Sequence, residues 1–120
     1  MLRTMLKSKI YYATVTEAQL HYKGSITIDE DIIEKANLLV HEKVEVLNMN
    51  NGSRIETYVI SGKRGSGIIC LNGPAARTGI KGDKLVILAY GLYDENEIKG
   101  LKANYVELDD ANKIKNIHLA

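Results

Sequence analysis

The chain has 120 residues, 45% of them hydrophobic and 26% charged, and its 16 basic and 15 acidic side chains leave a formal net charge of +1. This composition is ordinary for one globular domain, and the near-neutral charge argues against nucleic acid or an anionic membrane as partner. The longest apolar stretch, Leu85–Tyr90, is far shorter than a membrane-spanning helix requires. We find no signal-peptide pattern and only one cysteine, so we expect one cytoplasmic domain over residues 1–120.

The N-terminal part predicts a strand followed by a helix. Residues 10–16 are rich in β-branched side chains and tyrosine, which favour extended structure. Strict alternation along this strand would place on one face Lys9, Tyr11, Ala13 and Val15. After that, the apolar spacing becomes helical, which predicts a short amphipathic helix over residues 29–37 whose cap is Thr27 or Asp29.

The remaining segments predict a hairpin and further short strands. Residues 43–49 and 54–60 are strand-like, and they flank Asn51-Gly52, a dipeptide typical of tight hairpin turns. The later predicted elements are a loop over 61–67, a strand over 68–71, one helical turn within 72–77, and a strand over 84–90 buried on both faces. The tail from Asn104 alternates weakly. These elements predict a mainly β protein, a small closed or nearly closed β-barrel with one or two short helices. Since the chain has no Phe or Trp, its core must consist of Ile, Leu and Val.

Gly24-Ser25 is a dipeptide at which a chain can cleave itself. The serine hydroxyl can attack the preceding carbonyl carbon and turn the amide into an ester, and glycine hinders that attack least. Elimination and hydrolysis would then leave a pyruvoyl group at residue 25, an electrophile that no standard side chain supplies. A simple turn is the ordinary interpretation of the same two residues, and both interpretations stay open at this point.

Several other motifs have structural interpretations that we favour. Gly65–Gly67 lacks the remaining residues of a phosphate-binding loop, and Cys70 in its apolar run is typical of a buried thiol. The histidines, at positions 21, 41 and 118, lie far apart, which argues against a metal site. His21 precedes Ser25 by four residues, so a serine hydrolase is a third hypothesis, but the chain has no Gly-x-Ser-x-Gly motif.

Arg54 and Tyr58 share one face of the predicted strand that follows the hairpin turn. An arginine can bind a substrate carboxylate through two parallel hydrogen bonds, and a nearby tyrosine hydroxyl can deliver a proton. Taken alone, the pair is more typical of a surface arginine and an ordinary packed tyrosine, and we favour that structural interpretation.

A set of motifs that occur in a fixed order along the chain favours a functional interpretation of Arg54 and Tyr58. The blocks are Leu2–Leu6, Ala13–Ala18, Leu20–Ser25 with its His-Tyr-x-Gly-Ser pattern, Asn50–Tyr58 with Asn-Gly-x-Arg-x-x-Thr-Tyr, Arg64–Ser66, and Leu71–Arg77. Together they closely resemble the pyruvoyl-dependent aspartate 1-decarboxylases, from Met1 to about Tyr90, with a looser match beyond.

This resemblance implies a double-psi β-barrel that assembles as a homotetramer with active sites at subunit interfaces. It implies cleavage between Gly24 and Ser25 into chains 1–24 and 25–120, with a covalent pyruvoyl group derived from Ser25 and neither metal nor pyridoxal phosphate. L-aspartate would form a Schiff base with that group and lose CO2, giving β-alanine for pantothenate and coenzyme A synthesis. Whether a helper protein assists maturation is left open.

The resemblance also implies roles for individual residues. Thr57 would assist cleavage by hydrogen-bonding the Gly24 carbonyl, and Tyr58 would return a proton to the substrate α-carbon. The implied substrate-binding residues are Lys9, Tyr22, Arg54, Thr57, Asn72, Gly73, Pro74 and Ala75.

Some features depart from the family pattern. Tyr11 and Leu47 stand where many members have His and Trp, and Pro74 replaces a usual Ala and so lacks a backbone N–H. Strand alternation puts Thr57 and Tyr58 on opposite faces, so either a bulge or a strand end lies near Thr57, or the two act at different stages or from different subunits. The alternative function is an unprocessed β-barrel that binds or assembles without catalysis.

Overall fold

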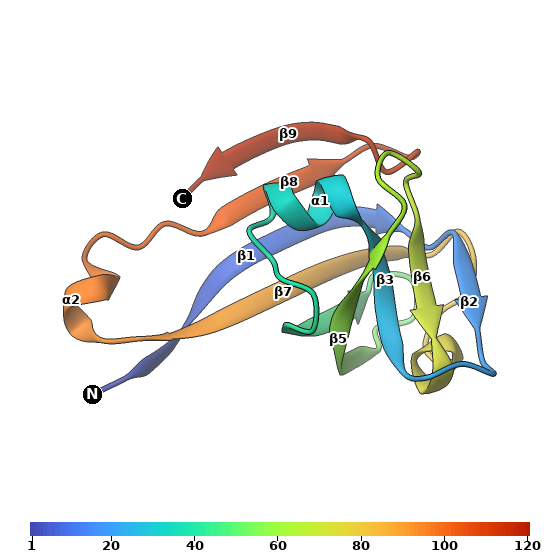
Figure 1. The fold of residues 1–120 in the computed structure, drawn as a ribbon, viewed down its shortest axis with the longest axis horizontal. Helices are drawn as coiled ribbons and strands as arrows, with labels where there is room; N and C mark the ends of the chain where they lie inside the picture. Colours follow the sequence, from blue (N-terminus) through green and yellow to red (C-terminus); the bar gives the residue numbers. More distant parts are fainter.

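Nine strands and three short helical segments make up the regular structure of residues 1–120 in the computed structural model (Figure 1). The strands are β1 (Arg3–Thr14), β2 (Glu17–Gln19), β3 (Ser25–Asp29), β4 (Lys43–Asn48), β5 (Arg54–Gly62), β6 (Ile69–Asn72), β7 (Lys84–Tyr93), β8 (Asn104–Leu108) and β9 (Ile114–Leu119). The helical segments are α1 (Glu30–Lys35), the 3-10 turn η1 (Gly73–Arg77) and α2 (Glu95–Ile98). None of them has the length and apolar character of a membrane-spanning helix.

The strands pair in the order β2-β6-β3-β5-β4-β7-β1-β8-β9, which mixes antiparallel and parallel neighbours. The parallel pairs are β1 with β8, β2 with β6, and β3 with β5. In Figure 1 the short strands β2, β3, β5 and β6 run across the direction of the long pair β1 and β7. The predicted mainly β, barrel-like architecture with short helices is confirmed.

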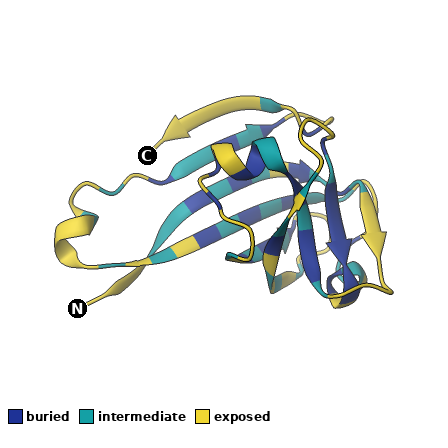
Figure 2. Cartoon of the chain, viewed as in Figure 1, coloured by how far each residue is buried: buried dark blue, intermediate teal, exposed yellow.

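One apolar cluster joins nearly all of these strands. Its twenty buried residues are Ile, Leu, Val and Ala; most lie on the strands, and α1 contributes Ile32 and Ile33. Figure 2 shows the buried positions concentrated where the short strands cross the long ones, whereas β9 and α2 are largely exposed. The core therefore forms without Phe or Trp, as the composition requires.

The first strand corrects one prediction. It starts at Arg3, and its pairing with β7 shifts register between Tyr11 and Ala13. A bulge of this kind inserts one residue and reverses the alternation beyond it. Ala13 is accordingly buried in the core, while Tyr11 and Lys9 are half-buried outside it. The predicted single face shared by these residues and Val15 is therefore wrong.

The hairpin prediction is confirmed. Strands β4 and β5 pair antiparallel on either side of the Asn51-Gly52 turn, where Gly52 has a φ of 76°. Strand β7 is longer than predicted and alternates, with Leu85, Ile87 and Ala89 buried and the residues between them half-buried, so it is not buried on both faces.

The C-terminal part has more regular structure than the sequence predicted. The weakly alternating tail forms β8 and β9, and β8 extends the sheet by parallel pairing to β1. The short helix α2 was missed, although Asp94 and Glu97 form a reciprocal capping box at its start.

Asp29 is the cap of α1 and also holds the loop between β5 and β6. Its buried carboxylate accepts hydrogen bonds from the backbone N–H groups of Asp31, Gly65 and Gly67, at 2.8, 3.1 and 2.8 Å. Burial opposes ionisation of this carboxyl, but the three donors outweigh it and lower its pKa.

Replacing Asp29 with alanine is expected to destabilise the fold by about 2–4 kcal/mol, because a cap is lost and buried N–H groups lose their acceptor. Since the folded pKa is depressed, the ionised carboxylate stabilises the fold above the unfolded pKa of about 3.9, and this contribution is lost as the pH falls through the folded value. Denaturant unfolding of both proteins at pH 7 and near pH 3 measures the difference. If the two proteins differ in unfolding free energy by the same amount at both pH values, the expected contribution of the ionised carboxylate is contradicted.

Candidate active site

The predicted cleavage site lies at the start of β3. Gly24 is half-buried and Ser25 is only 1% exposed. The pairing of β3 with β6 is antiparallel and sets Ser25 opposite Asn72 and Thr27 opposite Cys70. The sequence could not reveal this pairing, because the two strands are more than forty residues apart and no short turn connects them.

Asn72 holds the Ser25 hydroxyl. Its side-chain Nδ2 donates hydrogen bonds to Ser25 Oγ at 2.9 Å and to Thr27 Oγ1 at 2.8 Å. Asn72 is 3% exposed, so these bonds are shielded from water. A buried amide fixed by two acceptors keeps the Ser25 oxygen in one place, which is what an intramolecular attack requires.

Gly73 brings a second backbone against the segment just before the predicted cleavage site. Its φ is 65°, and a Cβ built on it would lie 2.6 Å from the carbonyl oxygen of Tyr22 and 2.8 Å from the backbone nitrogen of Gly24. Only glycine tolerates both this conformation and this proximity. Pro74 follows Gly73 in the first turn of the 3-10 segment η1, and a Cβ on Gly24 would lie 3.4 Å from the Pro74 Cδ atom.

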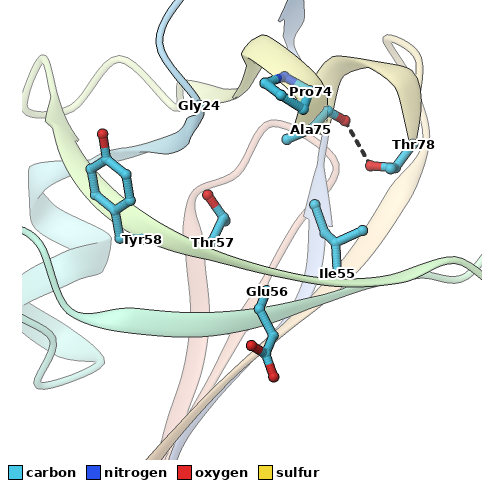
Figure 3. A pocket seen from close by; sticks show the side chains of 8 residues that line it. All are labelled: Gly24, Ile55, Glu56, Thr57, Tyr58, Pro74, Ala75 and Thr78. Atoms are coloured by element: carbon cyan, nitrogen blue, oxygen red, sulfur yellow. Dashed lines mark hydrogen bonds between the residues drawn. The ribbon is translucent and has the colours of Figure 1, made fainter.

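A pocket of about 350 Å³ opens next to Gly24 (Figure 3). Its lining residues are Gly24, Ile55, Glu56, Thr57, Tyr58, Pro74, Ala75 and Thr78. The carbonyl oxygen of Thr78 accepts hydrogen bonds from the side chains of Asn48, Asn51 and Ser53 in the hairpin turn. The turn therefore holds the 3-10 segment and β5 together as the two walls of this pocket.

Thr57 and Tyr58 both line the pocket, although no bulge lies near them. The pairing of β4 and β5 runs without interruption from Lys43 opposite Tyr58 to Leu47 opposite Arg54, so the bulge considered from the sequence is absent. Thr57 is half-buried and Tyr58 is 37% exposed at the rim, where its ring contacts that of His41 edge-on at 5.9 Å. Figure 3 shows both side chains on the Gly24 side of β5, with Glu56 pointing away.

The structure brings together only part of the predicted site within one chain. Gly24, Thr57, Tyr58, Pro74 and Ala75 line one pocket, and Ser25, Asn72 and Gly73 adjoin it through β6. No hydrogen bond joins the Thr57 hydroxyl to Gly24.

The predicted carboxylate-binding residues lie elsewhere. Arg54 is exposed and forms an ion pair with Glu45. Lys9 lines a separate pocket, whose other residues are Tyr11, Tyr12, Met49, Val86, Tyr105 and His118. Tyr22 is 54% exposed on the loop before Gly24. In a single copy of the chain, the pocket beside Gly24 therefore has no cationic side chain in its lining.

The hydrolase hypothesis receives no support from the geometry. His21 is exposed on the loop, and the hydrogen-bond partner of the Ser25 hydroxyl is Asn72. No group of three or more His, Cys, Asp or Glu side chains is arranged to hold a metal ion.

A family model described as aspartate decarboxylase matches residues 1–115. The chain belongs to the aspartate decarboxylase family. Among its relatives, the aspartate 1-decarboxylase of Syntrophus aciditrophicus is 57% identical over 96% of this chain and 99% of its own length. Those of Acetivibrio thermocellus and Bacillus cereus strain B4264 are 56% and 54% identical, each over 95% of this chain and 90% of their own lengths.

Sequence reasoning overlooked three neighbours of the site in this aspartate decarboxylase family member. Thr27 shares the Asn72 amide with Ser25, Cys70 contacts the same amide, and Thr78 closes the pocket. The spacing of two residues between Ser25 and Thr27, and between Cys70 and Asn72, was a usable signal. Every second residue of a strand points to the same face of the sheet, so these four side chains can meet when the two strands pair.

Proposed function

We propose that this chain converts L-aspartate to β-alanine and CO2, in service of pantothenate and coenzyme A synthesis, after cleaving itself between Gly24 and Ser25. Membership of the aspartate decarboxylase family supports the reaction. The observation that carries the self-cleavage is the buried Ser25 hydroxyl, held by Asn72 directly after a glycine at the edge of a pocket.

Cleavage requires only residues that surround the scissile peptide. Ser25 Oγ attacks the Gly24 carbonyl carbon, the C–N bond breaks, and the freed amine keeps the hydroxyl proton, so that an ester replaces the amide. Removal of the Ser25 α-proton then expels Gly24 as a carboxylate, and water releases ammonia from residue 25. Thr57, in the lining of the pocket that contains Gly24, is suited to stabilise the oxyanion that develops on the Gly24 carbonyl.

The surroundings of residue 25 fit a small carbonyl group in place of the serine side chain. Asn72 offers buried N–H donors there, and Gly73 leaves the space that any side chain would fill. A pyruvoyl group at this position supplies an electrophile for the substrate amine and a sink for the electrons released with CO2. Tyr58, at the rim of the same pocket, would hold the proton that returns to the α-carbon.

Substrate binding is proposed to need more than one copy of the chain. Arg54, Lys9 and Tyr22 lie outside the pocket beside Gly24, on surfaces that a neighbouring subunit could present to it. A homotetramer with sites between subunits would combine these side chains with Ser25, Asn72 and the pocket. A cytoplasmic location, with or without a maturation helper, is part of the same proposal.

Intact mass spectrometry combined with a β-alanine assay tests the function. We expect the purified chain to convert to pieces corresponding to residues 1–24 and 25–120, and β-alanine formation to rise in proportion. A chain that stays whole and inactive would favour the alternative, a β-barrel that binds or assembles without catalysis.

Changing Tyr58 to phenylalanine is expected to leave cleavage intact and to lower kcat per cleaved chain by about 100-fold, because only the proton donor is removed. Steady-state kinetics normalised to the cleaved fraction measure this. Tyr93→Phe, at the far end of β7, is the matched control and should be unaffected. An unchanged kcat for Tyr58→Phe would remove Tyr58 as the donor.

A further inference from the structure

Cys70 belongs to the same buried cluster as Ser25 but has no part in the function described so far. It lies on β6 two residues before Asn72 and directly opposite Thr27 of β3. Its side chain is 3% exposed, and its Sγ lies 3.2 Å from Asn72 Oδ1. No other side chain or backbone group donates to that oxygen, and the next acceptor of the thiol, the carbonyl of Leu71, is more distant at 3.9 Å.

The thiol is suited to act as a donor. Burial raises the pKa of Cys70, and the negative charge of Glu17 raises it further. The group is therefore an S–H at neutral pH and can donate a weak hydrogen bond to Asn72 Oδ1. A thiolate would instead repel that oxygen.

The direction of the Asn72 amide determines what Ser25 can do. With Nδ2 toward Ser25, the hydroxyl oxygen accepts a hydrogen bond and its own proton is not held by the amide. With the amide reversed, Oδ1 would hold the hydroxyl proton, and the N–H2 group would face a sulfur atom, which is a weak acceptor. A donor at position 70 favours the first arrangement, because it satisfies the buried Oδ1.

We propose that Cys70 is a positioning residue for self-cleavage: its S–H bond to Asn72 Oδ1 holds the amide with its N–H2 group toward Ser25 Oγ. This inference rests on the proposed function, since it assigns Cys70 to the cleavage step. It acts through Asn72 and touches no reacting atom.

Two substitutions of Cys70 separate this role from simple packing. Cys70→Val removes the donor and replaces it with a slightly larger apolar side chain, and it should slow cleavage by about tenfold, the effect of one hydrogen bond. Cys70→Ser restores a donor and should cleave at close to the wild-type rate. Ile69→Val is the packing control, because Ile69 is fully buried on the same strand and its side chain has no polar contact with Asn72. Cleavage is followed by intact mass over time.

A second measurement does not depend on cleavage. In chains blocked by Ser25→Ala, the Asn72 side-chain N–H2 protons, still bonded to Thr27, should exchange with solvent slowly when residue 70 is Cys or Ser and faster when it is Val. Equal cleavage rates and equal exchange in the Cys and Val proteins would overturn the role of Cys70. If the parent chain never cleaves, the proposed function fails, and the exchange rates still decide whether Cys70 orients Asn72.

Discussion

Replacing Ser25 with alanine is expected to abolish both cleavage and β-alanine formation. The change removes the hydroxyl that attacks the Gly24 carbonyl in the proposed cleavage, and with it the source of the electrophile at residue 25. The fold should survive, because alanine fits a position that is 1% exposed and Asn72 keeps its bond to Thr27. Intact mass and an assay for β-alanine measure the two losses, and circular dichroism checks folding.

Ser8→Ala is the matched control for this change. Ser8 is also 1% exposed, and its hydroxyl oxygen is buried without a hydrogen-bond partner, so its removal should affect neither stability nor cleavage adversely. If the Ser25→Ala protein still yielded pieces corresponding to residues 1–24 and 25–120, the proposed self-cleavage would be contradicted. Activity without pieces would show that the reaction proceeds without a group at residue 25.

Replacing Gly73 with alanine is expected to slow cleavage by about 100-fold, the size of effect that a misplacement of about 1 Å produces in an oriented reaction. The new Cβ would lie within 3 Å of the Tyr22 carbonyl oxygen and of the nitrogen and Cα of Gly24. All three are backbone atoms, so the segment that carries the scissile peptide must move. Cleavage time courses and thermal unfolding measure the effect.

Gly82→Ala separates this clash from backbone strain. Gly82 has a φ of 95°, but a Cβ there meets nothing within 4 Å. Both variants should lose some stability from the left-handed conformation, while only Gly73→Ala should lose cleavage. If Gly82→Ala cleaves as slowly as Gly73→Ala, then lost stability, rather than displacement of Gly24, explains the slow cleavage of Gly73→Ala.

Local signals predicted most of the elements. The Asn51-Gly52 turn, the helical spacing that ends near Lys35 and the single proline at the start of the 3-10 turn depend on neighbours in sequence, and each was found close to the predicted place. The prediction failed where pairing decides the outcome. The bulge between Tyr11 and Ala13 follows from the register of β1 against β7, and β8 forms because β1 offers it an edge.

The candidate site shows the same division. The ordered motifs identified the family, and with it Gly24, Ser25, Thr57 and Tyr58 as candidates. They implied Asn72 as a site residue but not its hydrogen bond to the Ser25 hydroxyl. Cys70 was interpreted as a small buried hydrophobe, although its thiol lies beside Asn72 on the same strand. Only the antiparallel pairing of β3 with β6 brings the Asn72 amide to Ser25.

Residue types and their order thus identify the aspartate decarboxylase family and single out Gly24-Ser25 as the bond at which we propose self-cleavage. Only the tertiary structure decides that the bond lies beside a pocket, that Asn72 holds the hydroxyl, and that Arg54 and Lys9 lie away from it in a single copy. The physical reason is that hydrogen bonds between distant strands depend on register, and register follows from burying one face of every strand in a shared core.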